Sequence, residues 1–415
     1  MKSVLKQALS LLLVILISVI KVNAQETTAE IQGLITVGKT GVAGASITAV
    51  HQPTGTKYVT TSRQDGRYNL TNLKIGGPYL LQVTYVGMKT EKQDDITLSL
   101  GQTYKANFSL TDANSNLKEV VVSSQKQDKV FNNARTGSQE TFNRNQITSL
   151  PTISRSYKDI IKLTPTYNGM SFGGQSSQLN NITIDGANFN NSFGLSGDIG
   201  GQTGQVAVSL DAIEQIQVNI SPFDVRQGGF VGGNVNSVSR SGANTATGSV
   251  YQYMKSKDWQ GYEVNAAPYT ITVPKQDFNY DLKGFTVGGA LIKNKLFYFV
   301  NAEQEERTAP AHTWTASTSS SAPNGTTISN ANAADLDALA AFLKSKYNYD
   351  PGAYQNYSYA SKSKRLTAKI DWNIDENNTF SLKYSYLKSS SDQPPSNSGS
   401  VGRRQADATA LPFYG

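Results

Sequence analysis

The sequence contains no cysteine and only two histidines, His51 and His312. The lack of cysteine excludes disulfides, thiol catalysis and thiolate metal sites. Zinc sites and Ser-His-Asp arrangements need a histidine with suitably spaced partners, and neither histidine has a second one nearby. The sequence therefore predicts that the chain is not an enzyme and that it has no cofactor and no metal site.

Long hydrophobic runs are also missing, apart from one at the N-terminus. There, Lys2 and Lys6 precede an apolar run of 13 residues from Ala8 to Ile20, and Ala24 ends a motif of the kind that signal peptidases read. Such a run is shorter than the roughly 20 residues that a helix needs to cross a bilayer. Residues 1–24 are therefore predicted to be a cleaved export signal. Any membrane passage by the mature chain must then use a closed β-barrel.

A strong charge of either sign is absent too. The chain has 38 basic and 31 acidic residues, and the export signal holds three of the lysines and no acid, which leaves 35 against 31. Such a small net positive charge gives no reason to expect nucleic acid as a partner.

The most informative pattern lies in residues 363–388. On either side of a turn at 375–378, over residues 366–374 and 380–386, apolar side chains occupy even positions and polar or charged ones occupy odd positions. This period of two predicts two long antiparallel strands with one apolar and one charged face. A soluble sandwich core would not accept those charges, whereas a membrane barrel has lipid on one side and a watery lumen on the other. The hairpin therefore predicts a transmembrane barrel of a bacterial outer membrane.

Residues 28–110 have the pattern of short strands separated by turn residues, which suits a small β-sandwich. Gly33 and the segments 41–48, 61–70 and 79–88 resemble the carboxypeptidase regulatory-like domain. Similar domains precede many outer-membrane receptors of the Bacteroidetes type. The resemblance implies that this domain lies in the periplasm.

A short β-branched run lies in the next segment, residues 115–126. Such a run between polar residues can add itself as a strand to the edge of another protein's sheet, or it can be the last strand of the preceding sandwich. It resembles a TonB box, and its place ahead of a plug-like segment favours that interpretation. The residues that would bind the periplasmic protein TonB are Leu117, Glu119, Val120, Val121 and Val122.

Residues 129–243 are rich in glycine and asparagine, with short strands and one expected helix over 156–163. Three segments resemble the plug domain of TonB-dependent receptors: residues 147–151, 182–186 and 211–242. The sequences of residues 152–156, 188–194 and 223–230 resemble the Oar-like branch of these receptors. The resemblance implies TonB-dependent active transport of an unidentified substrate across the outer membrane. TonB and outer-membrane lipid would be partners, and a surface lipoprotein could be another.

From residue 247 to residue 415 the sequence predicts about five barrel strands. They include a hairpin around 293–295, and a polar insertion at 305–361 with a helix over 335–347 is expected to lie outside the cell. Barrels of the family that the chain resembles have about 22 strands. The predicted fold class is mainly β: a small β-sandwich, an α+β plug domain and an incomplete antiparallel transmembrane β-barrel, as the N-terminal fragment of a longer protein.

Two groups of residues are candidate binding sites in the plug. A cluster after residue 186 suits hydrogen bonding and stacking against sugars or peptides, or it fills the interface between plug and barrel. Two arginines resemble residues that pair with barrel-wall carboxylates and lock the plug, or they are ordinary surface charges. The cluster consists of Asn188, Phe189, Asn190, Asn191 and Phe193, and the arginines are Arg226 and Arg240.

A different class of function is also open at this point. The chain could be a secreted or surface protein that binds carbohydrate or adheres through the sandwich, with the remainder as further sandwich. The charged strand faces and the glycine-rich plug-like segment argue against this alternative.

Overall fold

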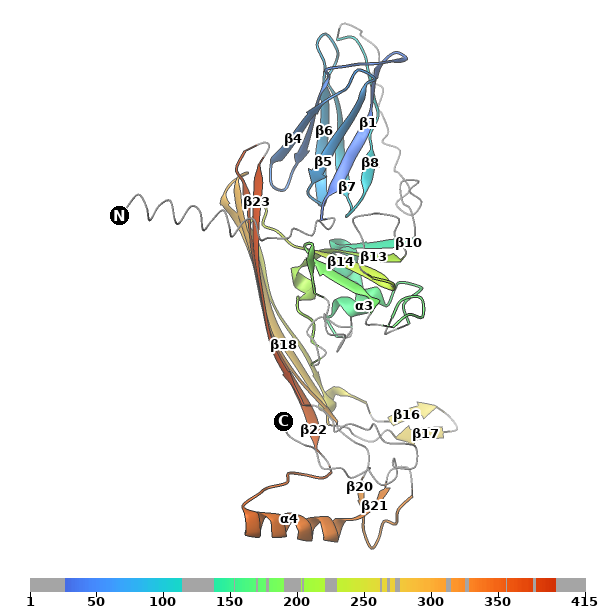
Figure 1. Ribbon diagram of the computed structural model, residues 1–415, viewed down its shortest axis with the longest axis vertical. Coiled ribbons are helices and arrows are strands. Elements are labelled where there is room, and N and C mark those ends of the chain that lie inside the picture. Colours follow the sequence, from blue (N-terminus) through green and yellow to red (C-terminus); the bar gives the residue numbers. More distant parts are fainter. Residues whose placement is uncertain are drawn as a thin grey trace, which may run out of the picture.

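A computed structural model describes residues 27–113, 138–152, 154–168, 171–176, 179–189, 203, 205–220, 230–261, 263–266, 269–272, 277–310, 315–324, 328–355, 357–375 and 378–392. Figure 1 shows a sandwich at one end, a plug in the middle and a long sheet standing beside the plug. No helix within these ranges has the length and apolar character needed to cross a membrane.

The sandwich consists of two sheets packed face to face. One sheet holds β1 (Ala29–Val37), β2 (Thr40–Gly41), β5 (Arg67–Leu73), β8 (Thr103–Lys105) and β9 (Phe108–Leu110), and the other has the order β4 (Thr56–Thr61), β3 (Ser46–His51), β6 (Gly76–Thr84), β7 (Glu91–Leu98). Alternate side chains of both sheets fill the core, among them Ile31, Ile47 and Leu81. The strand β7 was not predicted, because its first five residues are polar or charged and it lies at a sheet edge.

The plug is built on a five-stranded mixed sheet. Its order is β10 (Ser138–Asn143), β13 (Ile213–Ile220), β14 (Gly233–Ser239), β11 (Asn181–Ile184), β12 (Ala187–Asn188). The helices α2 (Arg144–Ser149) and α3 (Tyr157–Ile161) and the 3-10 helix η3 (Leu210–Ala212) pack on it through buried residues such as Ile147, Ile160 and Leu210. Ser156 caps α3, whose end at Ile161 falls short of the predicted 163.

The sheet beside the plug is antiparallel throughout, in the order β15 (Thr247–Ser256), β18 (Asn279–Ile292), β19 (Leu296–Pro310), β22 (Ser358–Asn373), β23 (Thr379–Ser391). The alternation predicted for the last hairpin is confirmed, since Ile370 and Trp372 are exposed while Arg365 and Thr367 are buried. Odd positions of this sheet contact the plug, as Glu303 does with Ser209 and Lys383 does with Asp185. They are therefore dry at this level, where open water in a lumen had been expected.

The two ends of this sheet differ in the length of their connections. Three residues link β18 to β19 and five link β22 to β23, whereas residues 257–278 and 311–357 form long connections at the opposite end. The second of these holds β20 (Thr315–Ser317), β21 (Ile328–Asn332) and α4 (Ala333–Tyr347). Because β19 and β22 pair as far as Pro310 and Ser358, the insertion is shorter than the predicted 305–361. In outer-membrane barrels long connections lie outside the cell and short turns inside.

The sandwich contacts the short-turn end of the long sheet and strand β13 of the plug sheet. Lys74 forms an ion pair with Asp371 of β22 at 3.4 Å, and Asn373 Nδ2 donates to Thr56 Oγ1 at 2.8 Å. On the plug, Gln215 and Gln217 of β13 bind the main-chain N–H and oxygen of Leu100, each at 2.7 Å. These contacts place the sandwich next to the plug on the side away from the long connections (Figure 1).

Candidate functional site

The inner face of the long sheet carries a buried cluster of charge. Arg365 of β22 pairs in register with Glu303 of β19, and its Nη1 lies 3.5 Å from Glu303 Oε2. A second ion pair joins Arg365 Nη2 to Glu305. The side chains of Arg365 and Glu303 are each 2% exposed. One cation shared by two carboxylates gives this part of the wall a net negative charge.

The plug contacts the wall at the same carboxylate. Ser209, directly before η3, donates its hydroxyl to Glu303 Oε1 at 2.5 Å. Tyr251 of β15 donates to the same oxygen at 2.7 Å, and Asn301 Nδ2 lies 3.0 Å from the Tyr251 hydroxyl. Because Ser209 is completely buried, the bond to Glu303 is a direct plug-to-wall contact shielded from water.

A glycine makes the Tyr251 contact possible. Tyr251, Gly284 and Glu303 are neighbours on three successive strands, so the tyrosine ring must pass over Gly284 to reach the carboxylate. A Cβ placed on Gly284 would lie 2.6 Å from the Tyr251 ring. The absence of a side chain at residue 284 therefore allows a hydrogen bond that skips one strand.

We expect Gly284→Ala to displace the Tyr251 ring from Glu303 and to destabilise the fold by about 1–3 kcal/mol, because the added methyl group overlaps the ring. Thermal unfolding of the detergent-solubilised protein measures the loss. The double variant Gly284→Ala/Tyr251→Ser removes the overlapping ring and should lose less stability than Tyr251→Ser and Gly284→Ala combined. Simple additivity of the two losses would show that the ring does not lie over Gly284.

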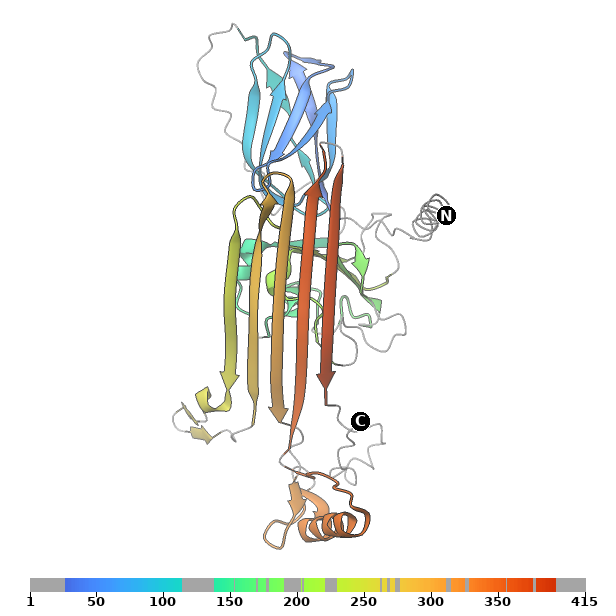
Figure 2. The same cartoon turned by 90° about the vertical axis from the view of Figure 1, so that its left-hand side faces the viewer.

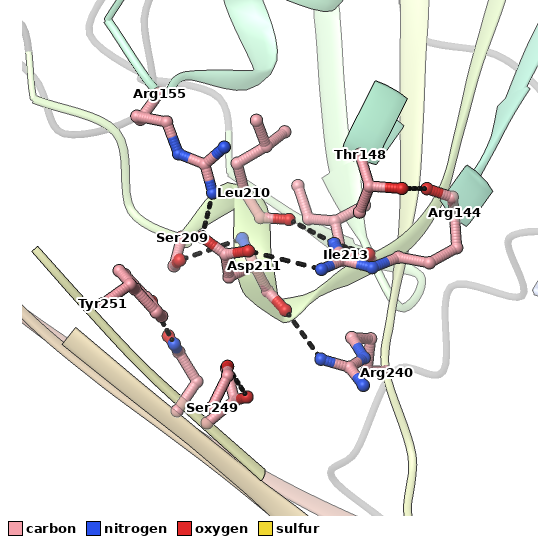
Figure 3. A network of polar contacts seen from close by, with 12 residues as sticks. Arg144, Thr148, Arg155, Ser209, Leu210, Asp211, Ile213, Arg240, Ser249 and Tyr251 are labelled. Carbon is pink, nitrogen blue, oxygen red and sulfur yellow. Dashed lines mark hydrogen bonds and ion pairs between the residues drawn. The ribbon is translucent and has the colours of Figure 1, made fainter. Parts of the chain in front are cut away.

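Asp211 gathers three arginines inside the plug (Figure 3). Arg155 forms an ion pair with Asp211 Oδ2, and Arg144 lies 3.3 Å from Oδ1. Arg144 also donates to the main-chain oxygens of Leu210 and Ile213 at 3.1 and 3.2 Å. The third arginine, Arg240, donates to the main-chain oxygen of Asp211 at 3.4 Å. The turn that carries Ser209 is therefore held by cations from three separate segments of the plug: the start of α2, the loop before α3 and the residue after β14.

A second direct contact between plug and wall lies at the β11–β12 turn. Lys383 of β23 pairs with Asp185 at 2.7 Å, and Ser239 binds the same carboxylate through its N–H at 2.7 Å and its hydroxyl at 2.5 Å. Burial alone would raise the pKa of Asp185, but Lys369 and Lys383 outweigh burial and hold that pKa below its usual range. Asp185 is therefore ionised at neutral pH, and acid that protonates it removes the ion pair.

The predicted site residues are divided between the described and undescribed parts of the chain. Most of them lie outside the described residues, namely the predicted TonB-binding residues from Leu117 to Val122, the plug residues Asn190, Asn191 and Phe193, and Arg226. Asn188 is exposed at the end of β12, whereas Phe189 is half-buried and packs against the plug core. Substrate binding by these residues stays a prediction.

Arg240 contacts the barrel wall in a way that the sequence did not suggest. A carboxylate partner on the wall was expected, but the guanidinium lies over the ring of Phe299 in β19, 5.1 Å from its centroid. Both wall carboxylates at this level, Glu303 and Glu305, instead form ion pairs with Arg365 of the wall itself. The contact with an aromatic face is a cation–π interaction.

Sequence reasoning missed the residues that hold the plug to the wall. They are Arg144, Arg155, Ser209, Asp211, Asp185, Glu303, Arg365 and Lys383. The alternation in the last hairpin had placed Arg365 on the polar face, and a search for an opposite charge at the same level of the preceding strand could have found Glu303.

Comparison with known proteins supports this architecture. Residues 30–111 match the family described as carboxypeptidase regulatory-like domain, and residues 238–411 match the outer membrane beta barrel domain. Over 153 residues, or 35% of this chain, the sequence is 26% identical to the TonB-dependent transporter Oar of Myxococcus xanthus. The match spans 14% of the length of that transporter.

Solved structures with a similar arrangement include two outer-membrane proteins. One is the siderophore receptor PirA from Acinetobacter baumannii, with 18% identity, a TM-score of 0.40 and coverage of 61% of this chain and 32% of that chain. The other is the outer membrane transporter YddB from Escherichia coli, with 13% identity, a TM-score of 0.41 and coverage of 62% and 33%. This chain therefore spans about a third of either protein.

The relatives are transporters and receptors, not enzymes. The matched outer membrane beta barrel domain and the sequence match with Oar indicate the outer membrane as the location. The chain carries a carboxypeptidase regulatory-like domain and strands of an outer membrane beta barrel domain, and part of its sequence is related to the TonB-dependent transporter Oar.

Proposed function

We propose that this chain serves TonB-dependent active transport of a substrate across the outer membrane, with residues 138–239 as the plug that closes the path. The observation that carries the proposal is the polar character of the plug-to-wall contacts: Ser209 with Glu303 and Asp185 with Lys383. Water can replace such bonds when a plug moves, because the net free energy of one hydrogen bond to a charged group is only about 1.5–3 kcal/mol.

The order of the segments supports a route for a pulling force. Residues 117–122, the proposed TonB box, precede β10 in the chain, and β10 is an edge strand that pairs only with β13 among the plug strands. A pull from the periplasm would first separate Ser138 from Ile220, the end pair of this ladder. Arg144 follows β10 directly and binds Asp211, two residues from Ser209. Removal of β10 would therefore loosen the turn that holds the plug to Glu303.

The sandwich and the exposed plug turn have supporting roles in this proposal. The sandwich would lie in the periplasm, since it contacts the turn at residues 293–295 and the turn after β22 through residues such as Asn294 and Asn373. Asn188 is exposed on the plug and would contact the substrate.

We expect Val121→Pro to weaken binding of the purified periplasmic domain of TonB by tenfold or more, because proline removes a main-chain donor that a strand pairing needs. Fluorescence titration of the detergent-solubilised protein measures the affinity. Gln127→Pro, outside the predicted box, is the matched control and should bind as the wild type does. Equal affinity of all three proteins would rule out residues 117–122 as the docking strand.

A further inference from the structure

The outward face of the long sheet lies toward the viewer in Figure 2. It is divided into an apolar band and a basic rim. From Leu366 of β22 to Ile374, the first residue after this strand, the even positions are apolar and either half-buried or exposed, over roughly 26 Å at 3.3 Å per residue. A lipid-facing band of about 25 Å is typical of outer-membrane barrels. The same register row as Leu366 holds Val250, Phe285, Ala302 and Tyr386.

The next outward row toward the long connections changes abruptly to polar and basic side chains. Lys283, Gln304, Lys364 and Lys388 are register neighbours on four successive strands. Lys364 and Lys388 are both exposed, and Lys362 follows one outward position further along β22. Because this end of the sheet carries the long connections, the row lies where the outer leaflet exposes its headgroups.

Lys364 and Lys388 form an unfavourable pair as the protein stands. They lie directly opposite each other in the ladder, and like charges in that position are destabilising. Lys283 has an acidic neighbour, Asp281, at 2.7 Å, but within the described residues no ion pair is found for Lys364 or Lys388. The opposite face of the same strands provides a contrast, since Lys383 there pairs with Asp185.

A shallow groove runs over this lysine pair. It has a volume of about 140 Å³, and its lining includes Gln304, Lys362, Lys364, Lys388 and Ser390. Glu306 also lines the groove, where it accepts a hydrogen bond from Gln304 Nε2 at 3.2 Å. Three ammonium groups, neutral donors and the carboxylate of Glu306 thus surround one small concave surface at the rim of the apolar band.

We propose that Lys364 and Lys388, supported by Lys362, bind a phosphate group of an anionic lipid in the outer leaflet. The acyl chains of such a lipid would lie along the apolar band that starts at Leu366 and Tyr386, and its phosphate would reach the groove one row further. A phosphate between the two ammonium groups removes their repulsion and forms charge-assisted hydrogen bonds with both. The site is separate from the plug contacts, because it lies on the other face of the sheet.

The test is native mass spectrometry of the full protein in uncharged detergent micelles with added monophosphoryl lipid A. We expect Lys364→Gln/Lys388→Gln to bind this lipid at least tenfold more weakly than the wild type, and Lys364→Arg/Lys388→Arg to keep its affinity. Lys344→Gln/Lys346→Gln in α4 changes the net charge equally far from the groove and should bind as the wild type does. Phosphatidylethanolamine, which has no net charge, should bind weakly to all four proteins.

Equal affinity of the glutamine pair and the wild type for monophosphoryl lipid A would overturn the proposal, as would an equal loss in the α4 control. Tight binding of phosphatidylethanolamine by the wild type would also overturn it, because the site would then not recognise charge. A misfolded variant would be seen as lost heat-modifiable mobility on a gel. If the double variant misfolds, the single variant Lys364→Gln replaces it in the comparison of lipid affinity with the wild type. In lipid-free micelles this single variant should have an unfolding temperature no lower than that of the wild type, because it removes the repulsion between Lys364 and Lys388.

Discussion

Arg365→Leu should destabilise the barrel wall by about 3–5 kcal/mol, the usual cost of removing one partner from a buried ion pair. The variant leaves Glu303 and Glu305 facing the plug without their shared cation. Both carboxylates are on the same face of β19, so they also repel each other. We expect a lower unfolding temperature in detergent and weaker retention of the plug, measured by thermal unfolding and by protease digestion of the plug in folded protein.

Two comparisons distinguish this account from a general effect of lost charge. Lys364→Leu removes the same charge one residue away on the outward face and should not destabilise the protein. Arg365→Gln/Glu303→Gln/Glu305→Gln removes the cation and both anions together, and it should recover much of the stability that Arg365→Leu loses. A triple variant as unstable as the single variant would contradict the assignment of the loss to uncompensated carboxylates.

In the variant Asp211→Asn, the plug should leave its closed position more often than in the wild type. The substitution keeps the shape of the side chain but removes the charge that Arg155 and Arg144 share, and the two arginines are only 17% and 21% exposed. We expect a cost on the order of 2–4 kcal/mol, because cations that are largely buried lose their counter-ion. The turn with Ser209 would then leave Glu303, and the conductance of the protein in a planar bilayer should rise.

The control for this variant is Asp335→Asn in α4, where the aspartate is exposed. It changes the net charge equally and should leave the conductance unchanged. If Asp211→Asn conducts no more than Asp335→Asn, the arginine cluster does not hold the plug in place.

Much of the fold could be predicted from the sequence because local patterns determine it. The alternation from Leu366 to Tyr386 specifies which face of each strand meets lipid, since a one-residue shift would expose every charge. The turn at Asn294 was found for the same reason, as it separates two long alternating runs. The strand β7 was missed because an edge strand with one solvated face need not be apolar.

The contacts that hold the plug could not be predicted in the same way. Glu303 and Arg365 are 62 positions apart, and their pairing depends on the register of β19 against β22 across a long insertion. Asp211 meets Arg144 and Arg155 only after the plug has folded. An alternating pattern specifies the face on which a charge lies, but not the charge that it meets there.

The central claim is that β22 has lipid on one face and the plug on the other. Because the chain has no cysteine, single cysteines at positions 366 to 372 can carry a nitroxide in reconstituted bilayers. The account predicts high accessibility to oxygen, which dissolves in lipid, at positions 366, 368, 370 and 372, and low accessibility to both oxygen and a water-soluble nickel complex at 367, 369 and 371. Equal accessibility along the strand, or oxygen contact at the odd positions, would contradict it.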